Sequence, residues 1–236
     1  MRGFVRSGVG AISLAVLLVT TAQRASAQVG HPPDASPYHD IRLGNTVVVS
    51  TGEMNGSGGS LGVGPASGPI YSVRIERPLG RTLGAALTFA QASTSRYILD
   101  PDQDSLHRKS GPFDARTSMI MLGLDASLTG GKTWRGFSPY IGATGGVAFE
   151  NSLSADTSTY KFGDKAVIGP EMGLRWFLGK RLSLRGDFKL LYWKLSYPLA
   201  YKQPSPIDGS RIMVVDANTS EWTHNTYLTA GISWTF

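Results

Sequence analysis

The chain has 236 residues, with 23 basic and 17 acidic side chains, 29 glycines and no cysteine. This length fits one domain or two small ones, and a hydrophobic fraction of 41% excludes a chain that is disordered throughout. The lack of cysteine excludes a disulfide scaffold and a thiolate metal site. Charged residues are few, at 17%, whereas glycine and aromatic residues are abundant.

Residues 1–27 have the pattern of a cleaved secretory signal peptide. Arg2 and Arg6 precede an apolar stretch that is too short to span a bilayer as a helix, and Ala25-Ser-Ala27 matches a small-residue cleavage site. Cleavage removes three arginines, the third being Arg24, and no acidic residue, so the formal net charge falls from +6 to +3. The basic balance is therefore partly a property of the export segment, and we expect no nucleic-acid partner.

Residues 28–38 form a proline-rich polar segment, which we interpret as a flexible leader. Beyond it the apolar residues recur at every second position, which is the period of a β-strand. In 182–192, for example, Leu182, Leu184 and Phe188 share one face, and the opposite face is mostly polar. This alternation predicts eight strands, at His39–Thr51, Pro69–Leu79, Leu83–Tyr97, Ala115–Leu128, Phe137–Glu150, Ala166–Leu178, Leu182–Ser196 and Trp222–Phe236.

The connections between these strands alternate between short and long. The short ones are Gly80–Thr82, Thr129–Gly136 and Gly179–Arg181, and their glycines recur about every 50 residues. The long ones are Gly52–Gly68, Ile98–Asp114, Asn151–Lys165 and Tyr197–Glu221. Antiparallel hairpins with short turns at one end and long loops at the other are typical of an up-and-down barrel of the outer membrane.

The two faces of the predicted strands distinguish a membrane barrel from a soluble one. One face is uniformly apolar, as in Ile120, Leu122 and Leu124, whereas the other combines small residues with charged ones. A soluble barrel has an apolar interior, and a membrane barrel reverses this arrangement. We therefore expect residues 39–236 to form an eight-stranded antiparallel up-and-down transmembrane β-barrel that is apolar outside and polar inside.

Aromatic residues on the apolar face are predicted to form two girdles at the two membrane interfaces. Those expected near the short turns are Phe137, Trp176 and Trp234, and those expected near the long loops are Tyr71, Phe149 and Tyr192.

Three segments carry a resemblance to a known family. The C-terminal segment ends in Phe236, with apolar or aromatic residues at alternating positions before it, and it resembles the signal by which outer-membrane proteins are recognised for assembly. The residues that carry this signal are Tyr227, Leu228, Ala230, Ile232, Trp234 and Phe236. Ser138–Val147 and Gly173–Asp187 resemble strands of small OmpA-like and opacity-type barrels.

The resemblance implies a Gram-negative-type outer membrane as the location, with both termini of the mature chain in the periplasm. It implies outer-membrane lipid, lipopolysaccharide and the barrel-assembly machinery as partners, and a monomeric barrel domain alone, with no peptidoglycan-binding domain after the last strand. An extracellular ligand could bind through the long loops.

Charged residues are predicted on the inward face in equal numbers of each sign. The predicted interior network consists of Arg42, Arg74, Glu76, Asp125, Glu150, Glu171, Arg175, Arg185, Asp187 and Lys189. An eight-stranded barrel is just wide enough for side chains to fill it, and small inward residues such as Gly142 and Gly146 leave room for long ones. The network is thus expected to be a packed, ion-paired plug, with a narrow path for ions or small solutes as the alternative.

Catalytic and metal-binding motifs have little support. Gly58–Gly62 matches the pattern of a nucleophile elbow, but no strand, turn and helix surround it. The four histidines lack the spacing of a metal site, so we predict no metal and no cofactor. A lipid-modifying hydrolase or acyltransferase at the barrel rim, using His224 with Ser220 or His107 with Ser110, is the enzymatic alternative to a non-enzymatic role.

Two places depart from a regular barrel. Pro170 lies on the lipid face of the sixth predicted strand, where a closed barrel has no free edge for a proline, so that strand is expected to begin later or to be bulged. In the last long loop, the apolar run Arg211–Val215 suggests that the end strands continue outward as a hairpin, or else that these residues pack over the barrel mouth.

From the sequence we predict a non-enzymatic outer-membrane protein that acts in envelope integrity or surface interaction, with porin-like passage of small solutes as an open possibility.

Overall fold

The computed structural model describes residues 36–150 and 160–236, and within this part of the chain Pro37–Phe236 form one compact unit. The predicted signal peptide and nearly all of the predicted leader lie outside the described residues. The strands are β1 Tyr38–Asp40, β2 Thr46–Gly56, β3 Gly68–Pro78, β4 Leu83–Leu99, β5 Lys109–Ser127, β6 Lys132–Trp134, β7 Phe137–Glu150, β8 Lys165–Phe177, β9 Leu182–Ser196 and β10 Ser220–Thr235. No helix in the described ranges is long and apolar enough to cross a membrane.

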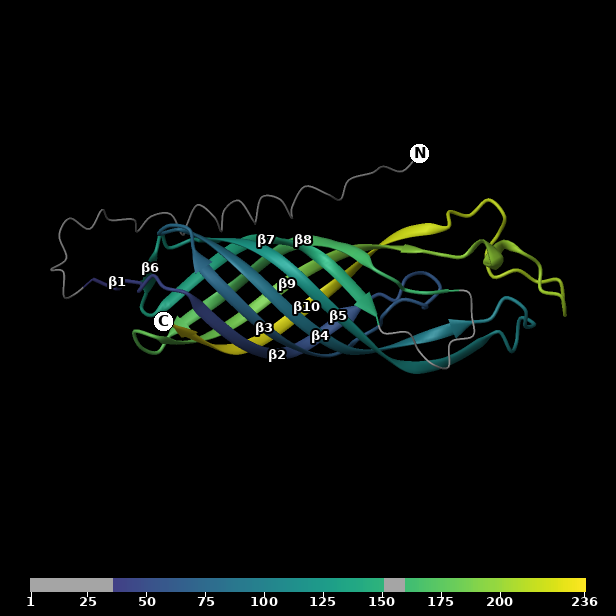
Figure 1. Cartoon of the computed structure of the whole chain (residues 1–236), viewed down its shortest axis with the longest axis horizontal. Helices are drawn as coiled ribbons and strands as arrows, with labels where there is room; N and C mark the ends of the chain where they lie inside the picture. The colour runs from purple at the N-terminus through teal and green to yellow at the C-terminus, as the bar shows by residue number, and fades with distance from the viewer. Residues whose placement is uncertain (1–35, 151–159) are drawn as a thin grey trace, which may run out of the picture. The chain divides into compact units, whose positions relative to one another are not determined.

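Eight of these strands close into an antiparallel barrel (Figure 1). Their order is β7-β5-β4-β3-β2-β10-β9-β8, and β8 pairs with β7 to complete the ring. The first and last barrel strands meet along eleven residue pairs, from Asn225–Gly56 to Thr235–Thr46. The predicted eight-stranded barrel is therefore confirmed, and the barrel has no unpaired edge in its wall.

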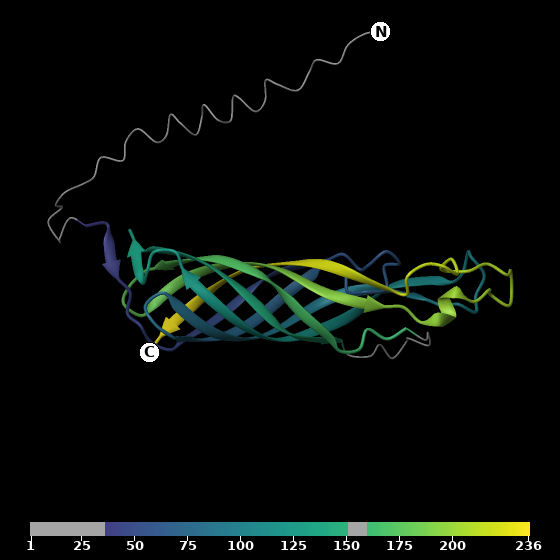
Figure 2. The same cartoon turned by 90° about the horizontal axis from the view of Figure 1, so that it is seen from above.

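The short turns and the C-terminus lie at one end of the barrel, and the long loops lie at the other end (Figure 2). Sequence periodicity located most strands well: β7 and β9 have the predicted bounds. The predicted strand His39–Thr51 is wrong, because residues 41–45 separate two strands there. β1 leaves the barrel wall and pairs with β6, which lies in the turn that precedes β7.

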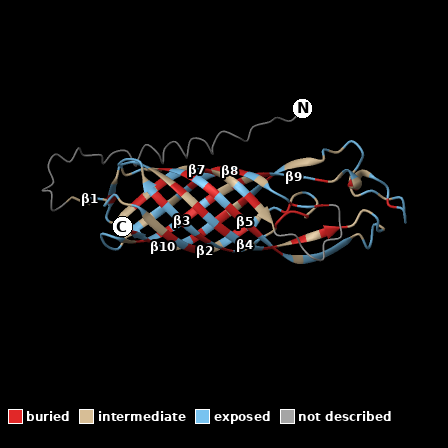
Figure 3. Cartoon of the chain, in the orientation of Figure 1, coloured by how far each residue is buried: buried red, intermediate tan, exposed pale blue. Residues whose placement is uncertain are grey.

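Buried and exposed residues alternate along the barrel strands (Figure 3). The outward face is apolar over a broad band, and its exposed side chains include Val73, Ile75, Leu122 and Leu124. Every second residue points inward and is buried, and these residues include arginines and carboxylates. This inside-out distribution is what strand alternation predicts for a barrel whose outer face meets lipid.

Pro170 belongs to a continuous strand, so the predicted late start or bulge of β8 is wrong. The strand begins at Lys165, and Pro170 is exposed on its outer face opposite Ala143 of β7. The ladder to β9 is interrupted between the pairs Ile168–Tyr192 and Glu171–Lys189, but the register is the same on both sides. The strand accommodates the missing amide donor by losing ladder bonds on one side only.

The strand pairs β4–β5 and β9–β10 extend past the ends of their other neighbours toward the long loops. β4 pairs with β5 as far as Leu99–Lys109, whereas its other ladder, to β3, begins at Ala92. The predicted outward hairpin in the last loop is not found: β9 ends at Ser196 and β10 begins at Ser220. Between them lie the 3-10 helix η3, Leu199–Lys202, and coil, in which Ile212 and Met213 pack against the buried core.

Candidate functional site

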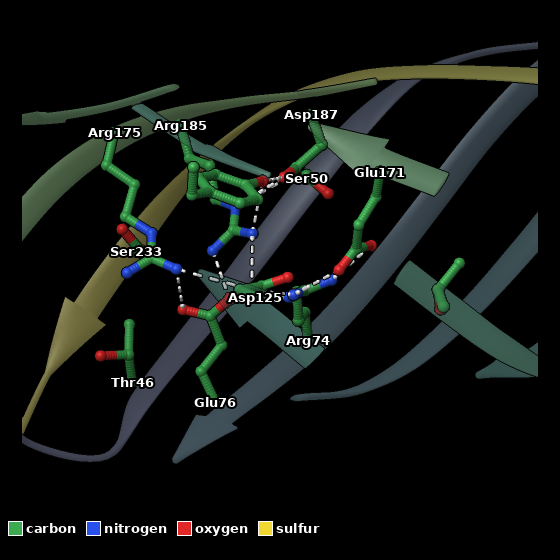
Figure 4. A network of polar contacts seen from close by, with 12 residues as sticks. Thr46, Ser50, Arg74, Glu76, Asp125, Glu171, Arg175, Arg185, Asp187 and Ser233 are labelled. Atoms are coloured by element: carbon green, nitrogen blue, oxygen red, sulfur yellow. Dashed lines mark hydrogen bonds and ion pairs between the residues drawn. The ribbon is translucent and has the colours of Figure 1, made fainter. Parts of the chain in front are cut away.

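A network of charged side chains fills the half of the barrel interior nearest the short turns (Figure 4). Arg74 of β3 lies at its centre. Its Nε donates to Glu76 Oε1 at 2.7 Å, its Nη1 donates to Glu171 Oε2 at 3.2 Å, and its Nη2 donates to Asp125. One guanidinium thus joins carboxylates from β3, β5 and β8, and all four side chains are buried.

Arg185 of β9 forms the second centre of the network. Its Nε donates to Asp187 Oδ1 at 2.7 Å, its Nη2 donates to the Tyr140 hydroxyl at 2.6 Å, and its Nη1 donates to Glu76. The Tyr140 hydroxyl in turn donates to Asp187. Since Glu76 contacts Arg74 as well, the two centres share a carboxylate and form one connected cluster.

Lys189 and Arg175 complete the network. Lys189 is buried and donates to Glu171, whereas the Arg175 side chain is 23% exposed, with its Nη2 3.4 Å from Glu76 and 3.6 Å from Asp125. Arg175 borders a cavity of about 70 Å³ at the short-turn end of the interior. Four basic groups therefore face four carboxylates, and Glu76, Asp125 and Arg175 border this cavity.

Glycines on neighbouring strands make room for the cluster. A Cβ atom on Gly142 would lie 2.7 Å from Asp125 Oδ1, and a Cβ atom on Gly123 would lie 2.9 Å from Glu171 Oε1. The interior at this level has no space for larger side chains, because the long charged groups of the opposite wall occupy it.

Two residues of the predicted network lie elsewhere. Arg42 precedes β2 and is exposed, so its predicted interior position is wrong. Glu150 is buried at the other end of the interior, where its Oε2 lies 3.0 Å from Arg96 Nε. The sequence analysis missed Arg96. Its even-numbered position in β4 places it on the same inward face as Ala90 and Thr94.

Around the Arg96–Glu150 pair, the half of the interior nearest the long loops has a large apolar core, which strand alternation had not predicted. Its core includes Met54, Ile70, Met119, Met121, Leu191, Trp193 and Leu195, together with the aromatic side chains of Tyr160, Phe162, Tyr197, Tyr201 and Tyr227. Phe162 packs edge-on against Trp193 at 5.9 Å between ring centroids. The sequence signal that could have predicted this apolar core is the inward position of Leu191 and Trp193 on β9.

Two of the long loops dock on one another above this core. The Ser105 amide donates to Asp208 Oδ2 at 2.9 Å, and the Ser205 hydroxyl donates to the Asp102 carbonyl at 3.4 Å. Arg108 donates to the Ser210 hydroxyl, and the Tyr201 hydroxyl donates to the Leu99 carbonyl at 3.3 Å. We call residues 100–108 and 197–219 the docked loops.

Hydrogen bonds shift the pKa of two groups in these loops. The Ser210 hydroxyl and the amides of Ser105 and Ser210 hold the pKa of Asp208 well below its usual range. Burial, together with a hydrogen bond to Glu221, raises the pKa of Tyr197 to about 12. At neutral pH both groups are therefore in the form that these contacts require, an ionised carboxylate and a neutral phenol.

The six predicted girdle residues all lie on the outer face of the barrel strands. Tyr71, Trp176 and Trp234 are exposed, and Phe137 stacks on Trp176 with 5.7 Å between ring centroids. Five of the six residues of the predicted assembly signal are also exposed on this face. The exception is Tyr227, which points inward and donates to the Ser72 hydroxyl at 2.7 Å.

The residues of the catalytic alternatives lie apart. Ser60 is exposed in a loop, where its amide donates to Glu221. His224 is exposed on the outer face of β10, and His107 Nδ1 lies 2.8 Å from Asp104 Oδ1 within its own loop. Within residues 36–150 and 160–236, no cluster of His, Asp and Glu side chains has the arrangement of a metal site.

Comparisons with known proteins show the fold. No family model and no curated protein matches the chain. The chain is similar to the crystal structure of Neisserial surface protein A, with a TM-score of 0.54 and 14% identity over 81% of this chain and 97% of that one. It is also similar to the outer membrane protein OprG from Pseudomonas aeruginosa, with a TM-score of 0.49 and 13% identity over 84% and 98% of the two chains. At 14% identity, the similarity to the Neisserial protein shows the fold alone, a closed eight-stranded antiparallel β-barrel.

Proposed function

We propose that this chain is a non-enzymatic protein of a Gram-negative-type outer membrane, and that it acts at the cell surface through its docked loops. The apolar outer face and the likeness in fold to outer-membrane barrels support the location. The signal-peptide pattern and the C-terminal pattern ending in Phe236 support export and assembly by the barrel machinery. Membership of the OmpA-like group, as a monomer, is part of the same proposal and relies on short motifs.

The main support for the proposal is a contrast between the two parts of the molecule. Side chains fill the barrel interior, whereas at the loop end hydrogen bonds hold the loops together as one surface. Among the described residues, the charged cluster fills one half of the interior and a core rich in apolar side chains fills the other, which favours a plug over an open channel. The loops, in contrast, hold one another through hydrogen bonds such as that between Ser105 and Asp208. A pre-organised surface loses little conformational entropy when it binds a partner.

A comparison of cells that carry the full chain with cells that carry a loop-shortened variant tests the proposal. In the variant, residues 101–107 and 203–212 are each replaced by a short glycine-asparagine turn, which leaves all barrel strands intact. We expect the full chain alone to promote adhesion of the cells to one another or to a eukaryotic cell layer. Equal adhesion by both strains, at equal amounts of folded protein in the outer membrane, would contradict the proposal.

Passage of small solutes is the first alternative, because a cavity borders the Arg175 side of the network. Single-channel recording of the purified barrel in planar bilayers tests it. We expect no stable open state, and a steady conductance would establish a channel in place of a plug.

Modification of lipid at the barrel rim is the enzymatic alternative, since His224 is exposed on the outer face. Mass spectrometry of outer-membrane lipids from cells with and without the chain tests it. We expect identical acyl patterns, and an altered pattern that His224→Ala abolishes would establish an enzyme.

A further inference from the structure

The exposed aliphatic side chains of the docked loops are Leu106, Leu199, Ile207, Val214 and Val215, and two of them lie in sequence beside the contact that joins the loops. Leu106 is 85% exposed and Ile207 is 62% exposed. Each is next in sequence to one member of the hydrogen-bonded pair Ser105–Asp208, so both side chains belong to the same docked unit. We call Leu106 and Ile207 the apolar tip.

The membrane around the barrel cannot cover the apolar tip. Between the apolar band and the tip, the outward positions of β4 and β5 are polar, as in Gln91, Ser93, Asp114 and Arg116. The loops lie at the far end of the long axis of the barrel (Figure 1). The tip is therefore held in water on the side away from the short turns, where exposed aliphatic groups favour an apolar partner.

The size of the tip favours a bilayer over a protein as that partner. Stable protein interfaces bury roughly 800 Å² on each side and are anchored by Trp, Tyr and Arg in fitted pockets. Two aliphatic side chains supply far less area, but they can enter the boundary between lipid headgroups and acyl chains, where a small apolar area gives weak and reversible binding.

The charge of the docked loops indicates which lipid. Their five aspartates face three basic residues, so the unit has a formal net charge of −2. Two of the charged side chains are also engaged within the unit, since Arg108 contacts Ser210, and Asp208 accepts from Ser105. An anionic bilayer is attracted by clusters of four or more basic residues, which this unit lacks. A zwitterionic bilayer has no net charge and does not repel this acidic unit, whereas an anionic bilayer does.

We propose that the apolar tip inserts into the zwitterionic phospholipid surface of a facing membrane. The inference rests on the proposed surface role. It identifies the class of partner as a phospholipid bilayer. Contact through two side chains is weak for one copy, and it becomes effective when many copies in one outer membrane face the same bilayer.

The test uses the full barrel in nanodiscs and sucrose-loaded vesicles of phosphatidylcholine. We expect discs that carry several barrels to sediment with the vesicles, and the double variant Leu106→Asp, Ile207→Asp to reduce the bound fraction at least fivefold. The matched control is Leu199→Asp, an exposed leucine in η3, nearer the barrel strands, which should bind like the parent. Gel migration before and after heating shows that all variants are folded.

Three results would overturn the inference: no sedimentation of the parent beyond empty discs, equal binding by the double variant, or binding only when phosphatidylglycerol is added. If vesicle binding fails while adhesion of cells still requires the loops, the surface role stands and its partner is a protein or glycan. If adhesion is independent of the loops as well, both proposals fail.

Discussion

Arg96 Nε lies 3.0 Å from Glu150 Oε2, and this ion pair joins β4 to β7 across β5, the strand that lies between them. Both side chains are almost fully buried at the loop end of the interior, next to an aromatic cluster in which the Arg96 guanidinium lies over the Tyr160 ring. The pair is thus a charged crosslink in apolar surroundings, separate from the network at the other end.

Removing one partner of this pair should be costly, because the other charge stays buried and loses this ion pair. We expect Arg96→Ala or Glu150→Ala to lower the free energy of unfolding by about 3–5 kcal/mol. The double variant Arg96→Met, Glu150→Leu should lose much less, since both charges are removed together. Urea unfolding in lipid vesicles, followed by tryptophan fluorescence, measures all three. A double variant as unstable as the singles would show that the pair itself stabilises the barrel.

Within the charged network, Glu171 and Arg175 should differ in importance. Glu171→Ala leaves the buried Lys189 without the carboxylate to which it donates, so we expect a loss of about 3–5 kcal/mol. Arg175 is partly exposed and has longer contacts, and we expect Arg175→Ala to cost about 1 kcal/mol. The temperature at which the folded gel band disappears compares them. Neither variant should conduct in planar bilayers, and a large conductance in either would argue against a plug.

Adjacent glycines of β7 offer a matched test of interior packing. A Cβ atom on Gly146 would lie 2.0 Å from the Ile120 carbonyl oxygen, whereas one on Gly145 would lie 3.5 Å from the Val167 carbonyl oxygen. We expect Gly146→Ala to destabilise the barrel by about 1–3 kcal/mol through overpacking. Gly145→Ala should have no measurable effect. Urea unfolding of the two variants provides the comparison, and equal midpoints would contradict the register of β7 against β5.

The docked loops should be stable to mild acid. The pKa of Asp208 is lowered by its hydrogen bonds, so its contribution to docking is complete above the ordinary pKa near 4 and is lost as the pH falls through the lowered value. We expect the Ser105 amide to be protected from hydrogen exchange at pH 5 and to lose protection, relative to its intrinsic rate, only in strong acid, well below the ordinary aspartate pKa near 4.

Asp208→Asn should remove that protection at neutral pH, because the anionic acceptor is lost. Asp216→Asn, a change of an exposed aspartate in the same loop, is the control and should leave the protection unchanged. Loss of protection already at pH 5 would show that another group controls the contact.

The C-terminal residue should matter for assembly more than for stability. Phe236 is 64% exposed, and its backbone amide donates to the Asn45 carbonyl at 2.9 Å. We expect Phe236→Ala to reduce the amount of folded barrel in the outer membrane several-fold and to leave the unfolding midpoint of the refolded protein unchanged. Leu184→Ala, on the same outer face, is the control. Equal amounts of the two variants in the membrane would contradict an assembly role.

Strand alternation explains why so much of the barrel was predictable. The bounds of β9 followed from a polar and an apolar face that each extend over many residues, and the charged half of the interior followed from Arg74, Glu76 and Arg185 sharing the inward parity. The start of β5 was missed because Gly111-Pro112 resembles a loop, although the structure includes both in the strand.

What alternation could not predict depends on contacts between distant segments. The apolar core at the loop end was missed because Met119 and Met121 occupy inward positions of β5, as the charged residues do on their strands. Alternation along a strand shows which face a residue is on but not how far along the barrel axis it lies. Docking between Ser105 and Asp208 joins loops without periodicity that lie 103 residues apart. The pairing of β1 with β6 similarly joins a segment before the barrel to one of its turns.

The docked loops connect opposite walls of the barrel, since β2 and β3 separate β4 from β10 on one side, and β7 and β8 separate β5 from β9 on the other. We therefore expect the loops to meet only after the strands between them have paired. Until then, the chain between Leu99 and Lys109 has no partner in the last loop and is open to proteases. Docking of the loops thus marks the completion of the ring. The time at which the loops become resistant to proteolysis is therefore a measure of when the final step of assembly occurs.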